Sequence, residues 1–280
     1  MPVSRRQLGL ATGAAALMAV GAGVSWQVAG HASAQNAVTS SSRTSGPSTG
    51  PTSTTPNPTS TPTARPTGLA HGARVLFQGD SITDVNRSRV DDGPNTRASL
   101  GAGYAWLAAS SCLVARPTQG LEFFNRGISG NTVADLAARW QRDTVALAPD
   151  VVSLLIGVND YWNRHRVLGY KGSPEKYHRE VDALVASTLE ALPGVRIVMC
   201  EPFLLVAGPV KESWQHDFAG YRQAAADIAL ARGLAFVGFQ SVLDLACELA
   251  PAGEWLHDGI HPTTSAAALM AREWVRVVGA

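Results

Sequence analysis

Short apolar runs alternate with amphipathic segments after His71, and this alternation restricts the possible folds of the 280-residue chain more than any other feature. The runs are rich in branched or aromatic residues, as buried strands are. They span Arg74 to Gln78, Leu121 to Asn125, Val151 to Ile156, Val195 to Cys200 and Ala235 to Phe239. Because strands that are apolar along their whole length must be covered on both faces, the pattern predicts an α/β fold with a mainly parallel sheet between two layers of helices.

The segments between these runs have helical patterns, and several end at Gly or Pro, the usual helix terminators. The predicted helices are roughly Ser99 to Ala115, Thr132 to Leu147, Pro174 to Leu192, Phe218 to Arg232 and Ser265 to Val278. In an open parallel sheet, ligands bind beyond the carboxyl ends of the strands. The residues that follow each strand are therefore the first place to look for a site.

The N-terminal 70 residues differ in composition from the rest of the chain. A basic start at Ser4-Arg5-Arg6 precedes an uncharged apolar stretch, Leu8 to Ala29, and the small-residue site Ala32-Ser33-Ala34. This order predicts an export signal over residues 1–34, and S-R-R-Q-L-G-L resembles the twin-arginine type. We expect a secreted protein with no stable membrane span after cleavage; the alternative is an uncleaved membrane anchor.

Residues 35–70 are mostly Ser, Thr and Pro with almost no large apolar side chain. Such a segment cannot bury enough surface to offset its ordering entropy, so it is predicted to be a disordered linker. The folded domain is then expected over residues 71–280, a size typical of one domain.

Charge and cysteine content exclude some function classes. The first 70 residues contain four arginines and no acid, which leaves 19 basic against 22 acidic residues in the rest. A near-neutral domain does not predict a nucleic-acid partner, which would require a basic face. The three cysteines form no C-x-x-C pair, and Cys112 and Cys200 lie in apolar runs. Buried free thiols are favoured over one bridge, and neither a metal nor a cofactor is expected.

Small polar residues follow the predicted strands. The blocks are G-D-S-I-T-D after the first, R-G-I-S-G-N-T after the second, G-V-N-D after the third and E-P-F after the fourth. Near the C-terminus, H-D-G-I-H-P places Asp258 three residues before His261. A serine becomes nucleophilic when an imidazole, oriented by a carboxylate, takes its proton. Ser81 is the candidate nucleophile; the alternative is that it only caps a helix.

Acyl transfer also requires donors for the oxyanion that forms in the reaction. Gly130 lies in a glycine-containing turn where a backbone N–H can approach a substrate closely. Asn159 offers an uncharged side-chain NH₂ at a strand end, and the N–H of Ser81 is a third candidate. We therefore predict an oxyanion hole formed by Ser81, Gly130 and Asn159.

In this order, the blocks G-D-S-I-T, G-I-S-G-N-T, G-V-N-D and D-G-I-H-P resemble the SGNH subgroup of the GDSL esterase and lipase family, over essentially all of residues 71–280. The resemblance implies a serine esterase with Ser81 as nucleophile, His261 as general base and Asp258 as its orienting carboxylate. It assigns the oxyanion donors to Ser81, Gly130 and Asn159. It also implies a three-layer α/β/α sandwich with a five-stranded, mostly parallel, flavodoxin-like sheet.

More narrowly, R-G-I-S-G-N-T-V-A-D-L-A-A-R-W and I-G-V-N-D-Y-W are similar to SGNH acetylxylan and xylo-oligosaccharide esterases, which remove acetyl groups from sugar hydroxyls. Intracellular deacetylases lack the N-terminal signal and linker of this chain. Because an exported enzyme would meet polymer, the predicted substrate is either a small-molecule ester or a polysaccharide ester. The alternatives are a short-chain lipase or thioesterase and a non-catalytic sugar-binding module. The sequence predicts no oligomeric state.

Other residues near these blocks are expected to support the site. Asp80 and Asp160 are predicted to hold the loops that carry Ser81 and Asn159, and Asp84 is interpreted as a first-turn helix acid. Three aromatic residues lie next to the blocks and either stack on sugar rings or pack beside a cleft. These residues are Tyr161, Trp162 and Trp255.

Overall fold

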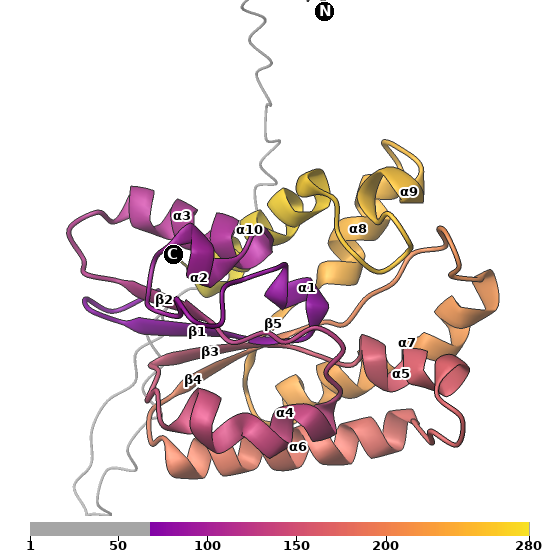
Figure 1. The fold of residues 1–280 in the computed structure, drawn as a ribbon, viewed down its shortest axis with the longest axis horizontal. Helices are drawn as coiled ribbons and strands as arrows, with labels where there is room; N and C mark the ends of the chain where they lie inside the picture. Colours follow the sequence, from indigo (N-terminus) through magenta and orange to yellow (C-terminus); the bar gives the residue numbers. More distant parts are fainter. Residues whose placement is uncertain (1–67, 280) are drawn as a thin grey trace, which may run out of the picture. The chain divides into compact units, whose positions relative to one another are not determined.

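The computed structural model describes residues 68–279, so the predicted signal (1–34) and most of the predicted linker (35–70) lie outside the described residues. A sheet of five strands forms the centre of the described part (Figure 1). Its order is β2-β1-β3-β4-β5, and every neighbouring pair is parallel. The strands are β1 (Arg74–Gly79), β2 (Glu122–Asn125), β3 (Val151–Leu155), β4 (Arg196–Cys200) and β5 (Ala235–Val237).

The sheet confirms the predicted strands and their direction. Because all strands are parallel, their carboxyl ends meet at one edge, where Gly79 of β1 lies beside Leu155 of β3. The central strand β3 is buried along its whole length, as its continuous apolar sequence predicts. This order is the flavodoxin-like one. Its topological switch point lies between β1 and β3, because β2 is added on one side of β1 and the later strands on the other.

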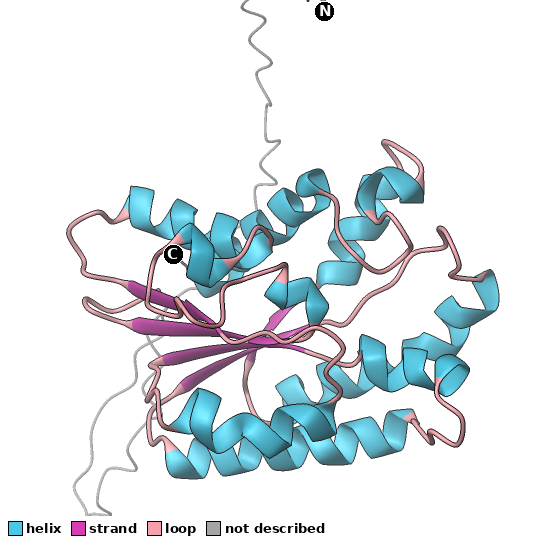
Figure 2. Ribbon diagram, viewed as in Figure 1, coloured by secondary structure: helices cyan, strands magenta, loops and turns pink. Residues whose placement is uncertain are grey.

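Two layers of helices cover the sheet (Figure 2). One layer contains α3 (Tyr104–Ala115), α8 (Phe239–Cys247) and α10 (Thr264–Val278). The other contains α4 (Val133–Trp140), α6 (Pro174–Ala191) and α7 (Glu212–Ala231). Figure 1 shows these layers above and below the strands. The predicted three-layer α/β/α sandwich is therefore confirmed.

Shorter helical segments complete the described part. They are α1 (Ser81–Asp84), α2 (Arg97–Leu100), α5 (Val158–Arg166), α9 (Ala252–Trp255) and the π-helical turn η1 (Gln141–Val145), which continues α4. The helices α5, α8 and α9 were not predicted. The prediction of α7 was also too short, because its first turns are mostly polar and have little apolar periodicity.

The predicted helix from Ser99 to Ala115 is interrupted in the structure. Gly101 has φ +78°, and a Cβ at this position would lie 2.5 Å from the carbonyl oxygen of Asp84. The chain must therefore leave the helical conformation to pass closely over the end of α1. As a result, α2 and α3 are separate helices, and α3 begins only at Tyr104.

The core contains the apolar faces of both helical layers. Phe77 of β1 is fully buried against the layer that contains α3 and α10, with ring centroids 5.0 Å from Trp274 and 5.7 Å from Tyr104. All cysteines are free, and Cys112 and Cys200 are buried, as expected. Between residues 68 and 279, no helix has both the length and the apolar character needed to cross a membrane.

Candidate active site

The turn after β1 places Ser81 at the start of α1. Asp80, not Ser81, caps this helix: its Oδ1 accepts a hydrogen bond from the Ile82 N–H at 3.0 Å. The Ser81 side chain is partly exposed and its Oγ points elsewhere, to a histidine. The placement of Ser81 therefore does not support the capping alternative, and its hydroxyl is available for chemistry.

Ser81, His261 and Asp258 form one hydrogen-bonded chain. The Oγ of Ser81 lies 2.8 Å from Nε2 of His261, although the two residues are 180 positions apart in the sequence. On the other side of the ring, Nδ1 of His261 lies 2.8 Å from Oδ2 of Asp258. This is the nucleophile, base and orienting-carboxylate geometry of serine hydrolases.

A tight turn before α10 holds Asp258 against His261. Its Oδ1 accepts hydrogen bonds from the backbone N–H groups of Ile260 (3.1 Å) and His261 (2.8 Å). Partial burial alone would raise the pKa of Asp258, but the hydrogen bonds and positive charge of His261 lower it below its usual value. Asp258 is therefore a carboxylate at neutral pH, able to fix one tautomer of the ring.

Backbone and side-chain donors are present at the neighbouring strand ends. Within residues 68–279, neither the Ser81 N–H nor the Gly130 N–H donates to a protein acceptor. Gly130 has φ +85°, is exposed, and has open space where a Cβ would stand. Asn159 uses one amide hydrogen to bond the Asn131 carbonyl at 3.1 Å, which fixes the orientation of its NH₂. These three groups therefore keep N–H donors that can form hydrogen bonds to an oxyanion.

Two buried carboxyl groups, those of Asp80 and Asp160, bond to backbone groups of the loops near Ser81 and Asn159. Oδ2 of Asp80 is buried with no hydrogen-bond partner among the described residues. Asp160 accepts from the Val133 N–H at 3.2 Å, which ties the start of α5 to the start of α4. Burial raises the pKa of both to about 7, although the Ile82 and Val133 N–H groups oppose the shift.

These raised pKa values predict a pH dependence of stability. A folded-state pKa of about 7 means that the folded protein holds the proton more tightly than the unfolded chain, where an Asp titrates near 4. The stabilisation is complete below pH ~4 and is lost as the pH rises through about 7. The unfolding free energy of the wild type should therefore fall as the pH rises from ~4 to ~7. In Asp160→Asn, whose side chain resembles the protonated acid, this fall should be smaller by on the order of 2–4 kcal/mol.

Urea unfolding at several pH values measures this difference. The exposed Asp91→Asn variant is the matched control and should keep the wild-type slope of unfolding free energy against pH. Equal slopes for wild type and Asp160→Asn would contradict the prediction.

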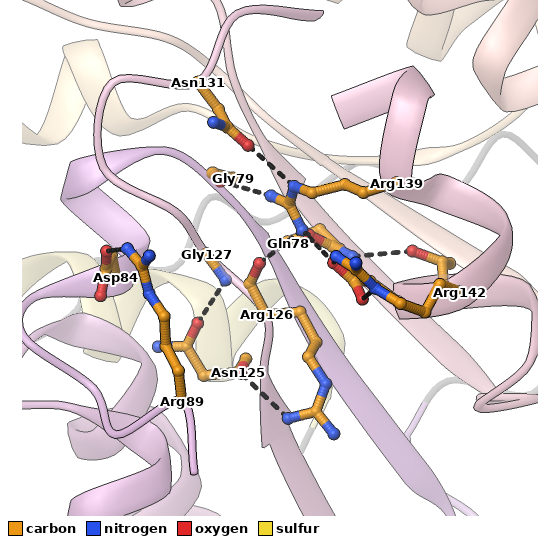
Figure 3. Close-up of polar contacts among 12 residues, drawn as sticks. Gln78, Gly79, Asp84, Arg89, Asn125, Arg126, Gly127, Asn131, Arg139 and Arg142 are labelled. Atoms are coloured by element: carbon orange, nitrogen blue, oxygen red, sulfur yellow. Dashed lines mark hydrogen bonds and ion pairs between the residues drawn. The ribbon is translucent and has the colours of Figure 1, made fainter. Parts of the chain in front are cut away.

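Arg139 holds the loop between β2 and α4 against the end of β1 (Figure 3). Its guanidinium donates to the Asn131 side chain (2.7 Å), the Arg126 carbonyl (2.7 Å) and the Gly79 carbonyl (3.2 Å). Asp143, one turn later, pairs with it at 3.0 Å and balances the buried charge. A single side chain on α4 thus joins the strand that precedes Ser81 to the loop that carries Gly130.

The three aromatic residues have different placements. The ring of Tyr161 is fully buried and packs edge-on against Phe218 and Tyr221, so its placement favours the packing alternative. Trp162 is partly exposed, with its ring 5.1 Å from that of Trp214. Trp255 is also partly exposed, and its indole N–H donates to the Ala250 carbonyl. Only the two tryptophans retain ring surface for a ligand.

The sequence did not reveal two of the residues that hold the site together, Arg139 and Asp84. Arg139 lies in the R-W pair after the second block, but no spacing rule connects it to Gly79. Asp84 is a first-turn acid of α1, as interpreted, but its carboxylate also accepts hydrogen bonds from Ser129, in the loop after β2. Its position within the same block as Ser81 was the only available signal.

Comparisons with known proteins identify the family of this chain. The sequence model of the GDSL-like Lipase/Acylhydrolase family matches residues 77–269. The acetylxylan esterase of Geobacillus stearothermophilus is 32% identical over 213 residues, which cover 75% of this chain and 96% of that protein.

Solved structures give the same assignment. A candidate GDSL-like lipase from Parabacteroides merdae superimposes with a TM-score of 0.74 and 42% identity, over 76% of this chain and 98% of that one. Axe2, an acetylxylan esterase from Geobacillus stearothermophilus, gives a TM-score of 0.70 and 29% identity, over 76% and 96% of the two chains. This protein therefore belongs to the GDSL-like lipase/acylhydrolase family and is a carboxylic ester hydrolase.

Proposed function

We propose that this enzyme removes acetyl groups from carbohydrate esters of the acetylxylan type, with Ser81, His261 and Asp258 as its catalytic triad. The observation that carries the proposal is the continuous hydrogen-bonded chain from Ser81 Oγ through His261 to Asp258. The similarity to two proteins named acetylxylan esterases supports the substrate class. Partly exposed Trp162 and Trp255 offer ring faces of the kind that stack on sugars.

Variants of Axe2 support the assignment of the nucleophile and base. Two solved structures are described as catalytic mutants of that enzyme, one with a serine and one with a histidine replaced by alanine. The separation of these two residues along the Axe2 chain is within one position of the 180 between Ser81 and His261. The same spacing of the same residue types is expected when both chains use one mechanism.

In the proposed reaction, His261 carries its hydrogen on Nδ1, where Asp258 accepts it, and Nε2 takes the Ser81 proton as Oγ attacks the acetyl carbonyl. The N–H groups of Ser81 and Gly130 and the amide of Asn159 donate to the oxyanion. The sugar alcohol leaves with the proton from His261. Water, deprotonated by the same ring, then hydrolyses the acyl-enzyme and releases acetate.

A second candidate, a short-chain lipase or thioesterase, has support in the similarity to the GDSL-like lipase candidate at 42% identity. It would use the same triad and differ only in the groups around the acyl chain and the alcohol. The sugar-binding module without catalysis does not agree with the family assignment.

Substrate comparison separates the two candidates. We expect acetate release from acetylated xylan and acetylated xylo-oligosaccharides, and a marked loss of kcat/KM as the acyl group of a p-nitrophenyl ester lengthens from acetyl to octanoyl. Ser81→Ala is the control for non-enzymatic release. Rapid cleavage of long acyl esters without acetate release from any acetylated saccharide would favour the lipase candidate and exclude the carbohydrate proposal.

We also propose that the protein is exported by the twin-arginine route and cleaved after Ala34, a proposal supported by S-R-R-Q-L-G-L and by the A-x-A site. An exported enzyme would meet polymeric substrate. N-terminal sequencing of protein recovered from culture medium should begin at Gln35; intact protein retained in the membrane fraction would support the anchor instead.

A further inference from the structure

Asp84 lies one helical turn after Ser81, at the end of α1. In a helix, residues three apart are neighbours, so the position of Asp84 relative to Ser81 is fixed by the backbone. The Asp84 residue is only 4% exposed. A buried carboxylate loses much of its hydration, so it requires partners that replace water.

Ser129, in the loop after β2, supplies these partners. Oδ2 of Asp84 accepts from the Ser129 N–H at 2.9 Å and from the Ser129 hydroxyl at 2.9 Å. Arg89 approaches the same oxygen at 3.3 Å and balances its charge (Figure 3). Hydrogen bonds to an ionised acceptor are stronger than those between neutral groups, so Ser129 is firmly held.

The next residue along the loop is Gly130, the predicted oxyanion donor. One position before Ser129, the Ile128 N–H donates to the Gly79 carbonyl at 3.1 Å. Two consecutive residues of the loop are therefore bonded to the two sides of the Ser81 turn, Ile128 to the strand end and Ser129 to Asp84. These bonds connect the residues just before Gly130 to the turn that carries Ser81.

We propose that Asp84 is a positioning residue that holds the Gly130 N–H at its working distance from Ser81 through the two hydrogen bonds from Ser129. The proposal depends on the function proposed above, in which Gly130 stabilises the oxyanion. A negative charge near a developing oxyanion is unfavourable by itself, so the contribution of Asp84 is geometric. The neutral side chain of Asn, whose carbonyl oxygen also accepts hydrogen bonds, should therefore largely replace it.

The first test compares Asp84→Ala and Asp84→Asn on p-nitrophenyl acetate. Displacement of a catalytic group by about 1 Å can cost on the order of 10²-fold, so Asp84→Ala should lose about 10- to 100-fold in kcat with KM nearly unchanged. Asp84→Asn should recover most of this loss. Asp91→Ala, which removes an exposed carboxylate of the neighbouring loop, is the matched control and should keep wild-type kcat.

Rates are expressed per active site, with the folded fraction measured by thermal unfolding, because loss of folded protein would also lower the apparent kcat. Ser129→Ala removes only the hydroxyl bond and should have a smaller effect than Asp84→Ala. The double variant Asp84→Ala with Ser129→Ala should be no slower than Asp84→Ala alone, since both changes break the contact between Asp84 and Ser129. Asn159→Ala, which removes a proposed oxyanion donor outright, provides the reference loss of about 10²- to 10³-fold.

A wild-type kcat per active site in Asp84→Ala, or equal losses in Asp84→Ala and Asp84→Asn, would overturn the proposal. When Asp84→Ala does not fold, Ser129→Ala decides: a lower kcat at wild-type KM supports the proposal, and an unchanged kcat overturns it. Failure of the proposed triad gives a different result, because Ser81→Ala would then remain active, whereas failure of the proposed substrate class appears only in the comparison of substrates. Inactive Ser81→Ala with fully active Asp84→Ala would overturn the positioning role alone.

Discussion

Replacing Ser81 by alanine is expected to lower kcat for acetyl esters by about 10⁴- to 10⁶-fold, to the small residual rate that binding and oxyanion donors alone supply. The fold should remain intact, because Asp80 and not Ser81 caps α1. Steady-state kinetics at saturating p-nitrophenyl acetate measure the loss, and circular dichroism verifies the fold.

Ser111→Ala is the matched control for this variant. Ser111 is an exposed serine of α3 whose hydroxyl bonds the Leu107 carbonyl of its own helix. It should keep wild-type kcat. A Ser81→Ala enzyme with more than about one-tenth of wild-type kcat would exclude Ser81 as the nucleophile, because loss of an essential nucleophile costs orders of magnitude.

His261→Ala is expected to cost about as much as Ser81→Ala, because the serine hydroxyl attacks only when a base removes its proton. The double variant Ser81→Ala with His261→Ala should be hardly slower than either single variant, since the two residues act as one unit. Kinetics of the three variants, measured side by side on one substrate, give this cycle.

His216→Ala, at an exposed position on α7, controls for the loss of an imidazole and should be fully active. If the fold-loss in kcat of the double variant equals the product of the two single losses, Ser81 and His261 act independently. That result would contradict the claim that they act as one unit. Retention of activity in His261→Ala would exclude it as the base.

Much of the fold follows from local sequence signals. The strands are short and apolar along their length, so their number, direction and approximate bounds could be predicted before any contact was known. The position of the site at the carboxyl ends of the strands follows from the parallel sheet. Ser81, Asp258 and His261 could be proposed because their residue types and motifs are distinctive, and the structure brings them into contact.

The elements that could not be predicted depend on contacts between distant residues. The helix expected from Ser99 is interrupted because Gly101 passes against the end of α1, a tertiary approach that periodicity does not record. The helix α5 has no side-chain cap at its start; Gly157, which precedes it, has φ +129° and faces the ring of Tyr177. Because the start of α5 has no capping side chain and its contact with Tyr177 is not local, α5 was absent from the prediction.

The supporting polar residues were missed for the same reason. Arg139 and Asp84 bond to residues that are distant in the sequence, and several of these partners are backbone groups, which any residue type can supply. The same limit explains Tyr161: its position beside Asn159 resembles a ligand contact, but its ring packs inward against Phe218. Proximity in sequence to a motif does not fix the direction of a side chain.

The central claim, that Ser81 forms the acyl-enzyme, can be tested most directly by peptide mass spectrometry after reaction with a fluorophosphonate. The account predicts one added phosphonyl group per protein, located on the peptide that contains Ser81, with its appearance following the loss of esterase activity. His261→Ala should label far more slowly because its serine lacks a base. Inactivation of the enzyme with the Ser81 peptide unmodified, or with the group on another residue, would contradict the account.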